Sequence, residues 1–304
     1  MRRTPASTRL PSWFRLASRL RGTSVAIGMP LFALGFAALI LPAGAPAAIP
    51  AAACAAGILL IAVGMPITLF PAAPEVQPFP IDPPLRGRWL IANSPADHVP
   101  SHGTHGLGQT WGIDFVPEPE PGSRPAFGTR GFDVPESYPG FGEPILAPAP
   151  GTVVSVSDGA RDHRTRTSRP AVAFMLAEGM VRELFGARRL LGNHVVLDLG
   201  DGVYAALAHL QRGSVCVEPG QRIASGDRVG ACGNSGNSSE PHLHFQLMDH
   251  PRPFVAAGLP FTLRRALGDR SAPPFVPGND EVLDVPEAAR PARSFELVGA
   301  HGAA

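Results

Sequence analysis

The chain contains no lysine: all 26 basic residues are arginine, and 25 acidic residues leave a formal net charge of +1. Without a strong positive charge, the composition gives no indication of a nucleic-acid partner. The missing lysine also excludes lipoyl- or biotinyl-type carrier domains, because these attach their cofactor to a lysine. Neither a Gly-x-Ser-x-Gly elbow nor a cysteine within a charged cluster occurs, so a serine or cysteine nucleophile is not indicated.

Charge is missing altogether from residues 25–74, where two apolar runs, 25–41 and 47–70, flank a Pro/Gly-rich break. Each run is about long enough to cross the ~30 Å hydrocarbon layer as a helix. We therefore expect a membrane anchor of two helices over 24–71, preceded by a basic cytoplasmic N-terminus, residues 1–23. The alternative is one long signal sequence followed by an Ala/Pro-rich linker.

The sequence has only three cysteines, of which Cys54 lies in the second apolar run. Cys216 and Cys232 flank a turn-rich segment, and neighbouring strands would bring them within disulfide range. A Cys216–Cys232 disulfide would favour the extracytoplasmic side of a membrane, whereas two spans starting inside would return the domain to the cytoplasm. Two unrelated buried thiols are the other interpretation. We expect the extracytoplasmic side.

Proline (35) and glycine (34) are abundant, which favours short strands and turns over helices. The pattern predicts a Pro-rich linker over 72–100, a β domain over 101–265 and a disordered C-terminal tail over 266–304. Residues 160–191 interrupt the β pattern, and 171–185 have the apolar spacing of a helix. This insertion is expected either to cover the cleft as a lid or to pack away from it.

Two histidines close together follow a Gly/Asn/Ser-rich loop, in the run Gly233-Asn234-Ser235-Gly236 to His242-Leu243-His244-Phe245. Alternate residues of a strand face the same way, so His242 and His244 share one face. Imidazole is both a zinc ligand and a general base. A bare His-x-His is more often a pair of surface residues. Here two other features favour a functional site: a further histidine, His209, also ends a strand-like run, and Gly112-Ile113-Asp114-Phe115 lies upstream.

In this order the motifs resemble the lysostaphin-type (LytM-like) zinc endopeptidases of peptidoglycan, over about 109–247. The other matching blocks are Gly142-Glu143-Pro144-Ile145, Gly151-Thr152-Val153-Val154, Gly192-Asn193-His194-Val195 and Ser225-Gly226-Asp227. The resemblance implies an all-β fold, an antiparallel β-sandwich with a duplicated motif, carrying a helical insertion. It also implies zinc-dependent cleavage of peptides in the cross-bridges or stems of peptidoglycan. An inactive domain of this fold, binding the wall or regulating a hydrolase, is the alternative.

Position by position, the resemblance makes Asp114 and His244 zinc ligands and His209 and His242 the catalytic pair. Asn193 and Tyr204 become candidate substrate contacts. The family's first histidine ligand corresponds to Thr110, and threonine is a poor zinc ligand. We expect His105 to replace it, because Gly106 and Gly108 would let the chain fold back. His102 is the alternative, and a chain without metal is the third.

Overall fold

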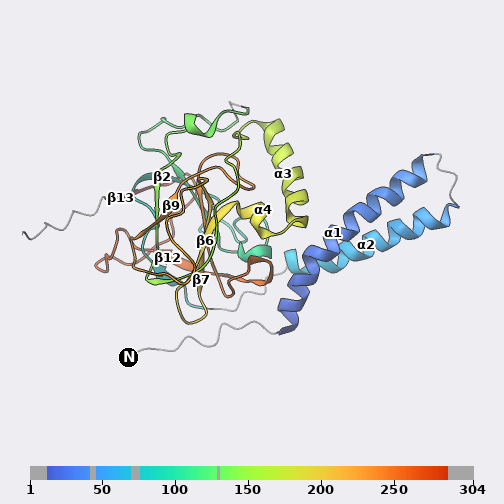
Figure 1. The fold of residues 1–304 in the computed structure, drawn as a ribbon, viewed down its shortest axis with the longest axis horizontal. Coiled ribbons are helices and arrows are strands. Elements are labelled where there is room, and N and C mark those ends of the chain that lie inside the picture. Colours follow the sequence, from blue (N-terminus) through green and yellow to red (C-terminus); the bar gives the residue numbers. More distant parts are fainter. Residues whose placement is uncertain (1–11, 42–45, 70–75, 129–130, 287–304) are drawn as a thin grey trace, which may run out of the picture.

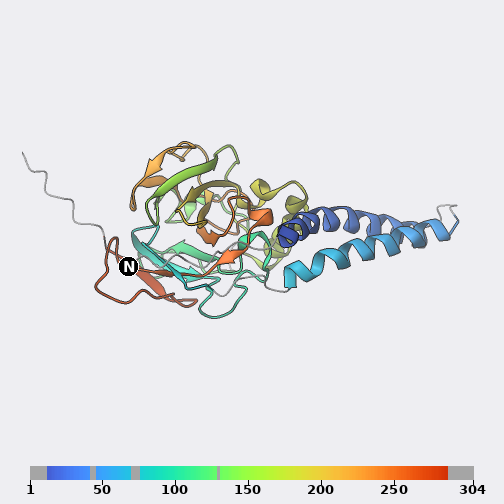
Figure 2. The same cartoon turned by 90° about the horizontal axis from the view of Figure 1, so that it is seen from below.

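The computed structural model describes residues 12–41, 46–69, 76–128 and 131–286, which form a β domain with a helical hairpin projecting from it (Figures 1 and 2). The helices are α1 (Ser12–Ile40), α2 (Ala48–Leu69), α3 (Arg169–Leu184) and α4 (Ala187–Leu191). The strands are β1 (Phe79–Ile81), β2 (Gly87–Ala92), β3 (Ile113–Pro117), β4 (Pro144–Leu146), β5 (Gly151–Ser157), β6 (Asn193–Asp198), β7 (Tyr204–Leu210), β8 (Arg222–Ile223), β9 (Arg228–Ala231), β10 (Leu243–Met248), β11 (Gly258–Leu259), β12 (Phe261–Leu263) and β13 (Val282–Val285).

Most of the strands in the described residues join one sheet, in the order β13-β2-β3-β10-β7-β6-β5-β8, with β11 on β10. Every pair within it is antiparallel. Two small sheets, an antiparallel β4-β9 and a parallel β1-β12, complete the domain. The sequence-based expectation of a mainly antiparallel β fold is confirmed, and its insertion is helical as expected.

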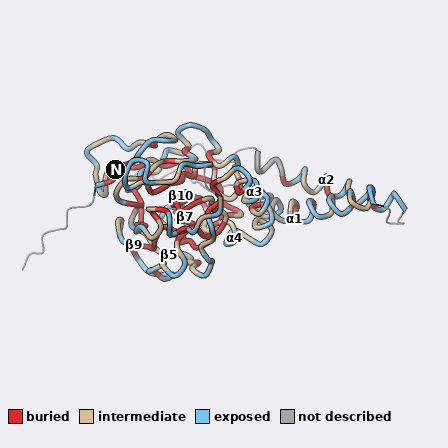
Figure 3. The backbone as a smooth tube through the Cα atoms, turned by 90° about the horizontal axis from the view of Figure 1, so that it is seen from above, coloured by how far each residue is buried: buried red, intermediate tan, exposed pale blue. Residues whose placement is uncertain are grey.

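Strand β10 lies at the centre of the sheet and separates two environments. Leu243, Phe245 and Leu247 join the hydrophobic core, with Phe245 edge-on against Phe261 at a ring separation of 5.1 Å. The core appears as the densest buried region around β7 and β10 (Figure 3). His244 and Gln246 alternate with these apolar residues and so face the other side. The apolar residues of β10 thus fix the register of the strand, and the polar residues that alternate with them face away from the core.

The two apolar runs of the sequence form α1 and α2, which pack closely where a glycine of one helix meets the other. A Cβ on Gly57 would lie 2.6 Å from the backbone nitrogen of Phe32, and one on Gly28 would lie 2.9 Å from the Gly57 oxygen. Large apolar side chains such as Leu34 and Leu59 are exposed on the hairpin. The expected membrane spans are not supported: among the described residues no helix has the length and apolarity needed to cross a membrane.

Three further expectations differ from the structure. Cys216 and Cys232 are free thiols, because Cys232 is buried in the core while exposed Cys216 directs its sulfur to the Arg228 carbonyl oxygen. The disulfide prediction was therefore wrong. Strand β13, within the supposed tail 266–304, pairs with β2 because Leu283 and Val285 are buried in the core. Strands β1 and β2, within the supposed linker 72–100, belong to the same domain. Residues 1–11 and 287–304 lie outside the described residues.

Replacing Phe245 by alanine should lower the free energy of unfolding by about 3–5 kcal/mol, because the ring is fully buried and a cavity would remain. Val154→Ala, at an exposed position of β5, should change it by no more than about 0.5 kcal/mol. Urea denaturation of both variants measures the difference. Equal stabilities would contradict the assigned orientation of β10.

Candidate active site

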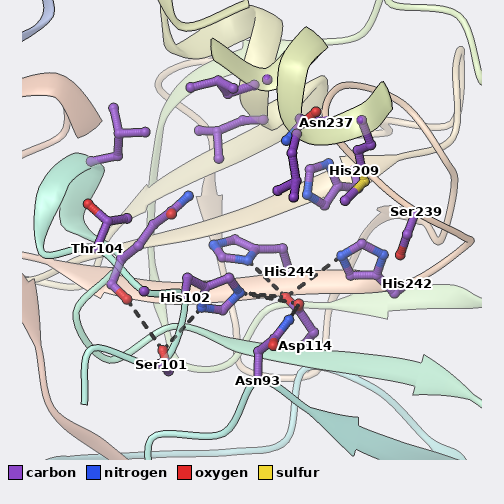
Figure 4. Close-up of a pocket in the computed structure, with 18 of the residues that line it drawn as sticks. Asn93, Ser101, His102, Thr104, Asp114, His209, Asn237, Ser239, His242 and His244 are labelled. Carbon is purple, nitrogen blue, oxygen red and sulfur yellow. Dashed lines mark hydrogen bonds and ion pairs between the residues drawn. The ribbon is translucent and has the colours of Figure 1, made fainter. Parts of the chain in front are cut away.

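An aspartate and two histidines from distant parts of the chain meet at one end of β10 (Figure 4). Asp114 on β3 lies directly opposite His244 in the strand register, and Asp114 Oδ1 is 2.9 Å from His244 Nδ1. His102 comes from the loop before β3, and its Nε2 is 3.2 Å from both carboxylate oxygens. One ligand atom from each residue lies within 4.8 Å of the others, a grouping that suits a metal ion.

The structure brings His102, the alternative candidate, to this group rather than His105. His105 is half-buried and its Nδ1 lies 3.2 Å from Thr110 Oγ1, on the other part of the loop. The loop closes at Ser101, whose backbone N–H donates to the Thr110 carbonyl and whose hydroxyl donates to the Gly112 carbonyl at 2.6 Å. This closure, more than the glycines, determines which histidine faces Asp114.

The hydrogen bonds around the group indicate that its polar atoms fit a cation. The Ser101 hydroxyl donates its hydrogen bond to the Gly112 carbonyl oxygen. Its oxygen can therefore accept a hydrogen bond from His102 Nδ1–H, 3.1 Å away. The neutral His102 ring then presents the lone pair of Nε2 to the Asp114 carboxylate, which also offers only lone pairs. Asn93 donates to Asp114 Oδ2 at 2.7 Å and leaves Oδ1 toward the imidazoles. Two imidazoles and one carboxylate match a hydrolytic zinc site.

Electrostatics within the group favour an ionised carboxylate. Burial by itself would raise the pKa of Asp114, but the nearby His102 and His242 rings and the contacts with His102 and His244 hold it well below its usual value. Burial lowers the pKa of His102, despite the opposing effect of Asp114. For His244, burial lowers the pKa, but the contact with Asp114 outweighs it and the net shift is upward.

A second pair of imidazoles, His209 and His242, lies beside the group, with ring centroids 4.8 Å apart. His209 Nδ1 is 2.8 Å from the Ser235 carbonyl oxygen, and His242 Nδ1 is 2.7 Å from that of Glu240. Since a carbonyl only accepts, each Nδ1 carries a proton, and in the neutral ring the lone pair is on Nε2. Burial and the neighbouring His242 and His244 rings lower the pKa of His209 well below its usual value, which keeps the ring neutral.

The backbone at His209 is unusual, with a φ of 61° in the left-handed region. Non-glycine residues rarely adopt this conformation, and such positions concentrate at functional sites. In this structure the conformation ends β7 and accompanies a ring contact with His244, at a centroid separation of 5.8 Å. The sequence placed His209 at the end of a strand but gave no sign of this geometry.

The imidazoles open into a cavity of about 730 Å³ whose far wall is the helical insertion. Met175, Leu176 and Gly179 of α3 line it together with His209, His242 and His244. A smaller cavity of about 370 Å³ shares Asp114, His242 and Met175 and adds Phe127 from the loop after β3. The insertion therefore borders the cleft, in agreement with the first of the two expectations for it.

The two proposed substrate contacts, Asn193 and Tyr204, differ in their position relative to the imidazoles. Asn193 is fully buried and its amide binds the backbone, donating to the carbonyls of Ala160 and Leu210 and accepting from Ala160 N–H. Tyr204 lies at the opposite end of β7 from His209, roughly 17 Å along the strand. Its neighbours are Met248 and Asp198 on the flanking strands. Both residues therefore have structural surroundings, and their contact with substrate stays a prediction.

Sequence reasoning missed the residues that orient the imidazoles: Asn93, Ser101, Arg124, Glu240 and Gln246. One signal was present, since Glu240 stands two residues before His242 in an otherwise neutral loop. Arg124 meets its carboxylate with two hydrogen bonds of 2.7 and 2.6 Å, and only 16% and 4% of these side chains are exposed. The remaining residues have no distinguishing spacing.

Comparison with known proteins gives a family match over part of the chain. Residues 129–255 match the model of peptidase family M23. This segment of the chain matches an M23 peptidase domain. A stretch of 65 residues is 37% identical to the peptidoglycan DD-endopeptidase ShyA of Vibrio cholerae, covering 21% of this chain and 15% of that protein. The chain thus aligns with well under two thirds of that relative. The lysostaphin-type resemblance of the sequence is confirmed.

Solved structures with similarity to the M23 domain include two catalytic domains. That of the prophage-encoded M23 protein EnpA from Enterococcus faecalis is 20% identical, covering 49% of this chain and 73% of that chain, with a TM-score of 0.29. That of lysostaphin from Staphylococcus simulans is also 20% identical, covering 50% and 79%, with a TM-score of 0.29. The family match begins at residue 129, so His102 and Asp114 lie outside it and rest on the geometry described above.

Replacing His102 by alanine should weaken Zn²⁺ binding by roughly 100-fold or more, because one of three candidate ligands would be lost, whereas His105→Ala should bind normally. Chelator competition, with metal analysis of the purified chain, measures both. Normal binding by His102→Ala together with loss in His105→Ala would restore the assignment made from sequence.

Replacing Arg124 by glutamine should lower the free energy of unfolding by about 3–5 kcal/mol, because Glu240 would remain as an unpaired buried carboxylate. The matched control is Arg88→Gln, whose ion pair with Glu118 is longer, at 3.8 Å, and more exposed, and it should cost at most about 1 kcal/mol. Urea titrations compare the two. Equal losses would show that the Arg124 pair has no special part in the fold.

Proposed function

We propose that the M23 domain is a zinc-dependent endopeptidase that hydrolyses peptide bonds in the cross-bridges or stem peptides of peptidoglycan. The observation that carries this proposal is the meeting of Asp114, His102 and His244 beside two further imidazoles, each held through its Nδ1 by a backbone carbonyl. A metal-binding group next to general bases is the composition of a hydrolytic centre. The family match and the printed activity of ShyA support the same substrate class.

Within this proposal the chain's residues divide the work. Asp114, His102 and His244 would hold the metal, and zinc when bound would supply Lewis-acid polarisation of the scissile carbonyl and an activated water. His242 Nε2, 3.7 Å from Asp114 Oδ1, is placed to take a proton as general base. The imidazole that takes this proton would stabilise the oxyanion while it holds the charge and would then return the proton to the leaving amine.

The cleft accommodates a peptide. Its volume of about 730 Å³ lies in the range of small-molecule sites, and α3 contributes apolar contacts from Met175 and Leu176 opposite the imidazoles. Peptidoglycan lies outside the cytoplasmic membrane, so the proposed activity belongs on the extracytoplasmic side. Exposed Cys216 offers a test, since a membrane-impermeant thiol reagent added to intact cells would label it only there.

Alanine in place of His209 or His242 should leave Zn²⁺ affinity within about threefold and lower kcat on purified peptidoglycan by roughly 10²–10⁴-fold, the usual contribution of a positioned acid or base. Release of new amino groups from the wall measures hydrolysis, and metal analysis reports the site separately. His163→Ala, in the insertion, provides the control. A wild-type chain that binds zinc and wall fragments without cleaving them would instead favour the inactive, regulatory alternative.

A further inference from the structure

Gln246 is a fully buried amide next to the metal group that the catalytic roles above do not use. It lies two residues after His244 on the same face of β10, and its Oε1 is 2.8 Å from His244 Nε2. Its amide nitrogen donates to the Leu107 carbonyl oxygen, also at 2.8 Å. One side chain therefore connects a candidate ligand to the loop that supplies the other histidine.

These two contacts determine the tautomer of His244. The Leu107 carbonyl only accepts, so the Gln246 nitrogen must face it and the Gln246 oxygen must face His244. That oxygen accepts a hydrogen bond from His244 Nε2–H. Nε2 therefore keeps a proton, and Nδ1, 2.9 Å from Asp114 Oδ1, is the nitrogen that can give up its proton to bind a metal.

The Leu107 carbonyl is presented by a turn of uncommon conformation. Leu107 has φ 60° and ψ 15°, in the left-handed region that a leucine seldom adopts. The next residue, Gly108, has φ 72°, and a Cβ there would lie 2.9 Å from the Gln246 amide nitrogen and 2.8 Å from Met248 Cγ. Glycine at 108 is thus required for the turn to approach Gln246 so closely.

We propose that Gln246 is a positioning residue that, held by the Leu107 carbonyl, selects the metal-binding tautomer of His244. The loop over 101–112 then has two tasks: it supplies His102 directly and orients His244 through Gln246. Correct closure of this loop prepares both imidazoles together. The inference rests on the proposed metal site, but the tautomer of His244 exists without metal and is measured separately.

The test uses substitutions at Gln246 in the full chain. Gln246→Leu removes both hydrogen bonds and should weaken Zn²⁺ binding about 10–100-fold in chelator competition, the usual cost of losing such a partner. Nitrogen-15 NMR of the metal-free protein should show that the proton of His244 Nε2 is no longer held there. Gln246→Glu keeps an acceptor for His244 and should restore the tautomer, with affinity between those of wild type and Gln246→Leu. Gln221→Leu, the same change at an exposed position, should alter neither quantity.

A second variant leaves Gln246 intact. Gly108→Ala should displace the Leu107 turn, free the Gln246 amide and weaken Zn²⁺ binding in the same direction. Unchanged affinity and an unchanged His244 tautomer in Gln246→Leu would overturn the inference. A wild-type chain that binds no zinc would contradict the proposed function, while a His244 proton confined to Nε2 only when Gln246 is present would still support the positioning role.

Discussion

The antiparallel pairing of β3 with β10 is the constraint on which the site depends. It places Asp114 directly opposite His244 although 130 residues separate them in sequence. The register is held by the apolar residues that alternate with them, chiefly Phe115 and Phe245 in the core. A slip of one residue would turn the histidine into the core and the phenylalanine outward. The paired strands β3 and β10 consequently present the hydrophobic core residues on one face and the candidate metal ligands on the other.

Burying four imidazoles and a carboxylate together is costly unless each polar atom has a partner. Backbone carbonyls and neutral side chains supply most of these partners. Ser235 and Glu240 accept from the catalytic pair, and Ser101 and Gln246 lie against the two candidate ligands. Each such contact fixes a tautomer, so the bases and lone pairs are already oriented before any substrate arrives.

The parts of the chain outside the sheet set the boundaries of the cleft. The insertion places α3 across the cleft from the imidazoles, and the loop after β3 is fastened beside His242 by the ion pair of Arg124 and Glu240. The hairpin of α1 and α2 projects from the same side as α3 and contacts it (Figure 1). The segments outside the sheet thus form walls of the cleft beside the imidazoles.

The sequence by itself determined the β-rich fold, the helical insertion and four members of the site, because short strands, turn residues and His-x-His are local patterns. It left the third candidate ligand open between His105 and His102. That choice belonged to the tertiary structure, since it depends on how Ser101 closes a loop against Thr110 and Gly112. The same holds for the free thiols and for Gln246, whose role arises from contacts between segments far apart in the chain. Local sequence patterns specify helices and strands, whereas contacts between segments far apart in the chain determine which side-chain atoms lie together.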